Sequence, residues 1–208
     1  MESSVDLIPP SEKVMDILTS TGAYRHGHFI YPNGKHASHY FQMPLAFQFY
    51  DNARILSVGL SRLFRMEKTI SSRLPKVAIV SPSPGGIMVA FGVREALSAE
   101  QIYWAEIEEG KRQFRQYIGS GDNVYPVIIV DDILRSGRAI RETIDLCHGI
   151  GAEVIGVGSI AAFDNAPTDF DGIPVKTLMK FDVNFYEDEA EWKASRSASD
   201  SPVETVRF

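Results

Sequence analysis

The stretch from Val127 to Ala139, VIIVDDILRSGRA, restricts the fold of this chain more than any other part of it. Its first four residues are β-branched and apolar, which is typical of a strand buried on both faces, as in a parallel sheet. Two acids, Asp131 and Asp132, follow at the point where an open α/β sheet binds its ligands. A short turn at Ser136 and Gly137 then leads into a run with rough helical spacing of its apolar residues. The sequence therefore predicts a strand, a polar turn and a helix.

This order of residues suits the binding of a phosphorylated sugar. Free backbone N–H groups and the positive end of the helix dipole make the start of a helix an anion site. The two carboxylates cannot bind phosphate, but they can accept hydrogen bonds from sugar hydroxyls or hold a divalent cation. Sugar, phosphate and metal together indicate a phosphorylated ribose. The alternative is an ordinary parallel strand that has an acidic end and is followed by a capped helix.

The same run resembles the motif that binds phosphoribosyl diphosphate (PRPP) in the type I phosphoribosyltransferases. That motif has an apolar strand, two acids, two apolar residues, a variable position, Ser or Thr, and Gly. The resemblance implies an α/β fold with a doubly wound, mostly parallel sheet, and Mg²⁺ as cofactor. It also implies that Asp131 and Asp132 bind the ribose and the metal, directly or through water. The order of segments favours the same fold, because a helix and a hairpin precede alternating strands and helices.

Length and composition are those of a globular protein, with 44% hydrophobic and 23% charged residues in a chain of 208. We expect a single domain over residues 1–208, because neither a linker nor a repeat divides the sequence. The net charge of −6 argues against a nucleic-acid surface. We find no apolar run of membrane-spanning length, no signal-peptide pattern, and one cysteine, Cys147, which we expect to be buried. These features predict a cytoplasmic enzyme that binds neither nucleic acid nor membrane.

The segment at about residues 20–45 is rich in aromatic residues and histidine. Asn33-Gly34 is a strong signal for a hairpin turn between two strands. With Gly27-His28-Phe29 before it and Tyr40-Phe41 after it, the segment resembles the N-terminal hood that roofs the base site of orotate phosphoribosyltransferases. A flat base needs aromatic walls and a few polar groups. The resemblance places Lys35, Tyr40 and Phe41 over the base.

Four of the five histidines lie in this hood segment, at positions 26, 28, 36 and 39. Zinc binding is one interpretation, but no cysteine joins them and the carboxylates lie elsewhere. We expect them to line a polar pocket instead.

Periodicity and turn residues predict the remaining elements. We expect helices over 51–64 and 87–97, and a first helix that is capped by Ser11, runs through Val14, Ile17 and Leu18 and stops near Gly22. We expect strands over 77–80, 101–105, 153–160 and 173–179. We expect a surface connection over 67–76 and, after a short helix, a charged tail over about 190–208. The resemblance to orotate phosphoribosyltransferases runs from about residue 11 to about 190, and residues 181–186 fit the family's final strand.

Two more segments match loops of the family. Residues 81–86 resemble the loop whose backbone amides bind the leaving diphosphate, with Pro84, Gly85 and Gly86 at the turn. Residues 106–117 resemble a mobile hairpin with its tip at Glu109-Gly110. In the family this hairpin closes over the substrate and its cations meet the diphosphate across a dimer interface, so we expect a homodimer. The matching cations are Lys111, Arg112 and Arg115. The alternative is a solvated hairpin with ordinary charges.

The chain departs from the family mainly around the base. Where the family has Thr-Thr-Gly-Gly-Ser in the phosphate turn, this chain has Arg135, Ser136, Gly137, Arg138 and Ala139. The family's arginine that holds the carboxylate of orotate appears here as Asn165, after Asp164. A hood serine is replaced by Ala37, and the Glu-Asp pair by Asp131-Asp132. An amide lacks both the charge and the bidentate fork of arginine, so another cation must bind the carboxylate if orotate is the substrate. Arg135 is the best candidate, ahead of Arg138 and Lys35.

The sequence predicts transfer of ribose 5-phosphate from PRPP to a nitrogen of a flat base. The acceptor is orotate, in pyrimidine biosynthesis, or another base, or else the fold serves a non-catalytic nucleotide-binding regulator. The expected catalytic residues are Asp131, Asp132 and Lys111. The expected PRPP-binding residues are Arg112, Arg115, Pro84, Gly85, Gly86, Arg135, Ser136, Gly137, Arg138 and Ala139. The expected base-binding residues are Lys35, Tyr40, Phe41, Arg135 and Asn165.

Overall fold

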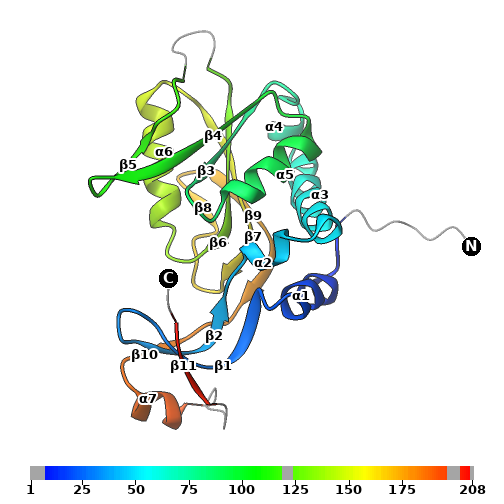
Figure 1. Ribbon diagram of the computed structural model, residues 1–208. Helices are drawn as coiled ribbons and strands as arrows, with labels where there is room; N and C mark the ends of the chain where they lie inside the picture. Colours follow the sequence, from blue (N-terminus) through cyan, green and yellow to red (C-terminus); the bar gives the residue numbers. More distant parts are fainter. Residues whose placement is uncertain (1–7, 119–123, 196–201, 207–208) are drawn as a thin grey trace, which may run out of the picture.

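A seven-stranded sheet forms the centre of the molecule (Figure 1) in the computed structural model, which describes residues 8–118, 124–195 and 202–206. The strands lie in the order β5 (Lys111–Phe114), β4 (Gln101–Glu108), β3 (Ala78–Pro82), β6 (Val127–Leu134), β7 (Val154–Phe163), β9 (Ile173–Phe181) and β8 (Asp169–Phe170). The five central strands are parallel, and the two edge strands pair antiparallel with their neighbours. The predicted mostly parallel α/β sheet is therefore confirmed.

Helices cover both faces of this sheet, which is why the central strands are apolar without alternation. Helices α3 (Tyr50–Met66) and α5 (Ile87–Leu97) lie on one face, and α6 (Arg138–Gly149) lies on the other (Figure 1). Residues 127–130 at the start of β6 are at most 3% exposed. On the α3 side, Phe64 and Ile70 pack so closely on β7 that a Cβ atom at Gly156 or Gly158 would overlap them. The doubly wound arrangement follows from this two-sided burial.

A second sheet of four strands forms the hood, below the large sheet in Figure 1. It contains β1 (Tyr24–Ile30) and β2 (His36–Phe41), which pair antiparallel around a turn where Gly34 has φ +82°. The strand β10 (Phe185–Tyr186) adds to β2, and β11 (Val203–Thr205) adds in parallel to β1. Helix α7 (Glu189–Ala194) packs on this sheet through Trp192, which is 2% exposed. The predicted hairpin is confirmed.

The hood histidines, expected to line a polar pocket, line neither of the two cavities at the edge of the large sheet. His28 and His36 are buried within the hood, with Nε2 of His28 2.6 Å from Nδ1 of His36. The His28 ring stacks on Trp192 at a centroid distance of 3.5 Å. His26 and His39 form an edge-to-face pair at 5.1 Å. Within the described part of the chain, no group of three or more His, Cys, Asp or Glu side chains could hold a metal ion.

Several expected elements differ in detail. Ser11 is the first residue of helix α1 (Ser11–Ser20) and does not cap it as expected. Pro10 occupies the N-cap position, with no side-chain hydrogen bond. The expected surface connection contains a helical turn, α4 (Lys68–Ser71), whose Ile70 is buried. The segment fitted to a final strand is divided, since β9 ends at Phe181 and β10 joins the hood. The expected tail includes β11, paired with β1.

The helix α2 (Pro44–Phe47) connects the hood to α3. Cys147 is buried, as expected. Among the residues that the structure describes, no helix combines the length and apolar character needed to cross a membrane.

Candidate active site

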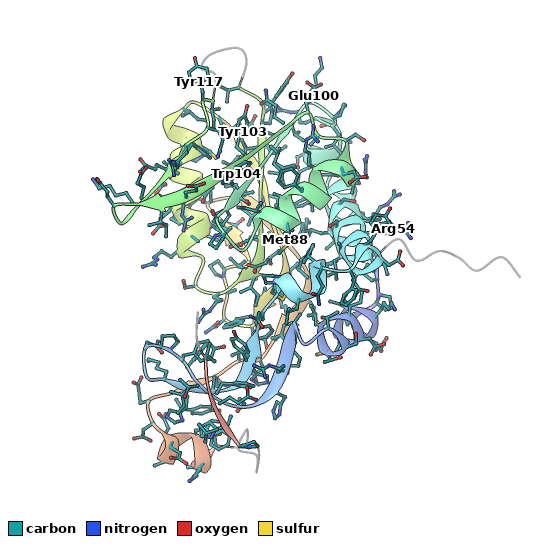
Figure 2. The ribbon with its side chains drawn as sticks, viewed as in Figure 1. Arg54, Met88, Glu100, Tyr103, Trp104 and Tyr117 are labelled. Carbon is teal, nitrogen blue, oxygen red and sulfur yellow. The ribbon has the colours of Figure 1, made fainter. Side chains whose placement is uncertain are left out.

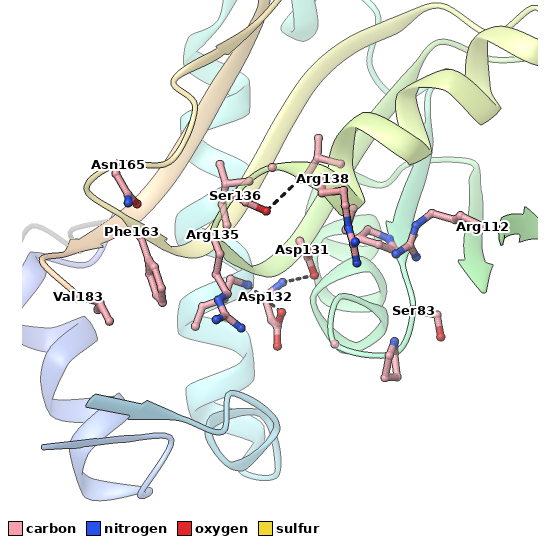
Figure 3. A pocket seen from close by; sticks show the side chains of 18 of the residues that line it. Ser83, Arg112, Asp131, Asp132, Arg135, Ser136, Arg138, Phe163, Asn165 and Val183 are labelled. Carbon is pink, nitrogen blue, oxygen red and sulfur yellow. Dashed lines mark hydrogen bonds between the residues drawn. The ribbon is translucent and has the colours of Figure 1, made fainter. Parts of the chain in front are cut away.

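The site lies at the switch point of the large sheet, between β3 and β6. The chain runs outward in one direction from β3 to β4 and in the other from β6 to β7, so the loops after β3 and β6 leave a crevice between them. A cavity of about 940 Å³ occupies this crevice (Figure 3), a size suited to a small-molecule ligand. Residues 82–85, from the last residue of β3 into the following loop, line one side of it, and residues 131–140 from the end of β6 to the start of α6 line the other.

The acid pair is held by its own backbone. Oδ1 of Asp131 accepts the N–H of Asp132 at 2.9 Å, and Oδ1 of Asp132 accepts the N–H of Ile133 at 2.8 Å. The loop after β3 packs against both carboxylates. A Cβ atom at Gly85 would lie 2.7 Å from Oδ1 of Asp132, and one at Gly86 would lie 3.0 Å from Oδ1 of Asp131. Glycine is therefore required at these positions for the acid pair and the loop to share the crevice.

The acid pair is electrostatically suited to a cationic ligand. Burial raises the pKa of Asp131 well above its usual value, and the neighbouring charge of Asp132 raises it further. Burial also raises the pKa of Asp132. Two close carboxylates resist ionising together unless positive charge or hydroxyl donors stabilise them.

The turn between β6 and α6 presents the start of a twelve-residue helix to the cavity. Gly137 has φ +78°, and a Cβ atom there would lie 2.9 Å from Pro167, so the turn requires glycine. The hydroxyl of Ser136 accepts the N–H of Arg138 at 3.5 Å. The first N–H groups of α6 have no carbonyl partners within the helix, which makes this end an anion site.

One acidic residue of α6, Glu142, holds two arginines at this end of the cavity. Arg112, whose side chain is 6% exposed, donates from Nε to Glu142 at 3.1 Å and from Nη1 to the carbonyl of Ala105 at 3.1 Å. Nε of Arg138 lies 3.6 Å from the other oxygen of Glu142. Sequence reasoning missed Glu142, although its position four residues after Arg138 on a helix was a usable signal.

The structure separates the other two expected loop cations from this cavity. Lys111 is exposed and lines a different groove, between β5 and α6. Arg115 is also exposed and lies 3.5 Å from Glu106. Among the three predicted loop cations, only Arg112 lines the cavity of this chain.

A second cavity of about 380 Å³ lies beneath the hood and shares four residues with the first. Tyr40 and Phe41 line it, as predicted, together with Tyr31, which sequence reasoning missed. Asn165 lines the first cavity. Lys35 lines neither, because it lies at the hairpin turn and pairs with Glu187 at 2.6 Å. The shared residues are Asp132, Ile133, Arg135 and Phe163.

Other lining residues had no clear signal in the sequence. Phe163 ends β7, and Val183 and Phe185 follow β9, so each reads along the chain as an ordinary apolar residue. They reach the site only because β7 and β9 end at the same edge of the sheet as β6.

The donor set suits Mg²⁺ when ligand oxygens complete it. Mg²⁺ is commonly bound by one or two carboxylates together with substrate oxygens and water. Asp131 and Asp132 supply two carboxylates at the cavity wall, next to the anion site of α6. The residues present therefore fit the ion as part of a substrate complex.

A parallel sheet with two acids, a phosphate turn and a glycine loop at its switch point, under an aromatic hood, defines a type I phosphoribosyltransferase. Comparison of the sequence with known proteins identifies the family within this class. The chain is 32% identical over 178 residues to the orotate phosphoribosyltransferase of Thermotoga petrophila, covering 85% of this chain and 89% of that protein. It is 30% identical over 180 residues to that of Caldanaerobacter subterraneus, covering 86% and 88% respectively. The chain belongs to the orotate phosphoribosyltransferase family.

The solved structures agree on the fold. The crystal structure of the orotate phosphoribosyltransferase from Aeropyrum pernix matches with a TM-score of 0.64 at 17% identity, over 81% of this chain and 93% of that one. No protein-family model matches the sequence.

Proposed function

We propose that the protein transfers ribose 5-phosphate from PRPP to orotate, giving orotidine 5′-monophosphate and diphosphate. The observation that carries this proposal is the convergence of the acid pair, the phosphate turn and the glycine loop on one cavity that continues beneath the hood. The names of the relatives support orotate as the acceptor.

In the reaction a ring nitrogen of the base forms a bond to C1 of the ribose and releases its proton, and the bond from C1 to the diphosphate breaks. Positive charge develops on the ribose ring as the diphosphate departs. Asp131 and Asp132 accept hydrogen bonds from the ribose hydroxyls and stabilise that charge. Burial raises the pKa of both groups, and positive charge developing on the ribose ring favours their ionised forms.

The phosphate groups are bound at the two loops. The backbone amides of residues 135–139 and the hydroxyl of Ser136 hold the 5-phosphate at the start of α6. The amides of residues 84–86, with Arg112 and Arg138, hold the diphosphate. Arg112 suits this role because Glu142 and the Ala105 carbonyl fix its guanidinium at the cavity wall before substrate binds.

We propose Mg²⁺ as the cofactor, held by Asp131 and Asp132 together with PRPP oxygens. The ion would neutralise charge on the diphosphate as it leaves. Removal of divalent cations with a chelator should abolish turnover, and Mg²⁺ should restore it.

A homodimer is the proposed assembly, and two observations support it. Lys111 and Arg115 lie on a hairpin that extends away from the cavity of their own chain, where they can reach a second subunit. Large apolar side chains are also exposed along α3 and α5, with Tyr50 79% and Phe91 50% exposed. Figure 2 shows Met88 on α5 and Tyr103 and Trp104 on the adjacent strand β4.

A cytoplasmic location is proposed on chemical grounds. The single cysteine, Cys147, is buried and cannot form an internal disulfide, so the fold suits a reducing compartment.

The decisive assay is release of diphosphate from PRPP with Mg²⁺, started by orotate. We expect turnover with orotate and little with uracil, adenine or guanine. A second candidate, transfer to another base, is favoured by Asn165, which lacks the positive charge of the family's arginine. Turnover with one of the other bases and none with orotate would establish that candidate instead.

A further inference from the structure

The side chain of Arg135 lies where the two cavities meet (Figure 3). It follows β6 directly, in the turn that precedes α6. Its guanidinium carbon is 5.5 Å from the ring centre of Phe163 and 5.4 Å from that of Phe185. Both rings are within cation–π distance of the guanidinium, and the side chain lines both cavities.

Arg135 differs from the other cations of the site in its partners. Three arginines line the two cavities: Arg112, Arg135 and Arg138. Arg112 and Arg138 both pair with Glu142, at the phosphate end. No carboxylate in residues 8–118, 124–195 or 202–206 lies within ion-pair distance of Arg135. Its charge is therefore available to an anionic group of a ligand at the base end.

The turn after β7 supplies no matching charge. Asn165 lines the cavity from the turn after β7, and its amide is neutral. Lys35 cannot serve in its place while it pairs with Glu187 outside both cavities. At the base end, the positive charge thus comes from the turn after β6 rather than from the turn after β7.

We propose that Arg135 binds the carboxylate of the acceptor base and so determines selectivity for a carboxylated pyrimidine over uracil. This inference rests on the proposed function and assigns the specificity of the same site. A guanidinium binds a carboxylate through two parallel hydrogen bonds, and stacking on Phe163 and Phe185 reduces the conformational freedom lost on binding.

Product nucleotides give a direct test, because they bind without reacting when diphosphate is absent. Orotidine 5′-monophosphate and uridine 5′-monophosphate differ only in the carboxylate. We would titrate both, by calorimetry, into the wild-type protein, Arg135→Gln and Arg141→Gln. The last is a matched control, since Arg141 also stacks on a phenylalanine, Phe170, but pairs with Asp171 outside the cavity.

Arg135→Gln should weaken the orotidine nucleotide by roughly tenfold to a hundredfold, as expected for loss of a charge-assisted hydrogen bond. It should change the affinity for the uridine nucleotide by less than about twofold, since the phosphate and ribose contacts remain. Arg141→Gln should change neither. Adding Asn165→Arg to Arg135→Gln should recover part of the lost affinity, because a guanidinium then enters the cavity from the turn after β7.

Each outcome decides a separate question. Equal affinity of the wild-type protein for the two nucleotides, or an equal loss for both in Arg135→Gln, would overturn the role of Arg135 while leaving the proposed transferase intact. Failure of the wild-type protein to bind either nucleotide would count against the proposed function itself. If Arg135→Gln does not fold, comparing orotate with its neutral amide as substrates of the wild-type protein tests the same charge. Equal kcat/KM for the two would overturn the inference.

Discussion

One carboxylate oxygen of Asp132 accepts the N–H of Ile133, a hydrogen bond that an amide oxygen could also accept. The proposed catalytic role of Asp132 depends instead on the negative charge of its carboxylate. Asp132→Asn keeps the shape of the side chain and removes that charge. We predict that turnover falls by about 10²-fold or more, because electrostatic stabilisation of the ribose cation is lost. The measurement is kcat for diphosphate release.

The matched control for this change is Asp16→Asn, an exposed carboxylate on α1. It should leave turnover unchanged. Near-normal turnover in Asp132→Asn would contradict the assigned role. A loss of folded protein, detected by a lowered Tm, would show that the change acts through stability instead.

Among the elements, the hairpin of β4 and β5 carries Lys111, for which we propose a role in catalysis. Its tip, Glu109-Gly110, has positive φ at both residues, and Lys111 begins the returning strand. If Lys111 meets the diphosphate, Lys111→Ala should lower kcat by roughly tenfold to a hundredfold. It should barely change the affinity for the product nucleotide, which carries no diphosphate.

Lys68→Ala, an exposed lysine on α4, is the control for the loss of surface charge. Limited proteolysis gives a second measurement on the hairpin. Cleavage near Gly110 should slow when PRPP and Mg²⁺ are bound. Cutting at the same rate with and without ligand would argue against closure of the hairpin.

The hood contains a histidine whose titration should affect stability. Burial lowers the pKa of His28, and the nearby charges of His36 and Lys193 lower it further, while the charge of Glu189 acts in the opposite direction. As the pH falls, His28 of the unfolded chain binds a proton near the ordinary histidine pKa of 6.5, whereas in the folded protein it binds one only at a lower pH. The free energy of unfolding should fall as the pH drops below about 6.5, and the loss should end below the folded pKa.

Urea titrations at several pH values test this expectation. His28→Phe keeps a ring against Trp192 but cannot bind a proton, so its unfolding free energy should vary less with pH. His148→Phe, at an exposed position of α6, should follow the wild type. If His28→Phe and the wild type have the same pH dependence, the loss arises at other groups.

At the scale of the whole molecule, the sequence predicts the large sheet well and the hood less well. The first four residues of β6 form a continuous apolar run, which predicts a buried strand from local sequence alone. The polar residues and glycine that follow this run correctly place the acid pair and the phosphate turn. By contrast, β10 and β11 are short strands that exist because distant segments pair with β2 and β1. Nor could spacing show that Lys35 pairs with Glu187 instead of facing the cavity. Such contacts depend on tertiary packing, which no local pattern encodes.

The proposed dimer predicts that two inactive variants complement each other. An Asp132→Asn subunit lacks the acid pair but carries Lys111, and a Lys111→Ala subunit has the reverse. If the hairpin acts across the interface, each mixed dimer contains one site with both residues. Equal mixing after dissociation should then recover about a quarter of wild-type activity, since half of the dimers are mixed and one of their two sites is complete. Activity no higher than the mean of the separate variants would place Lys111 in its own chain's site or outside the reaction.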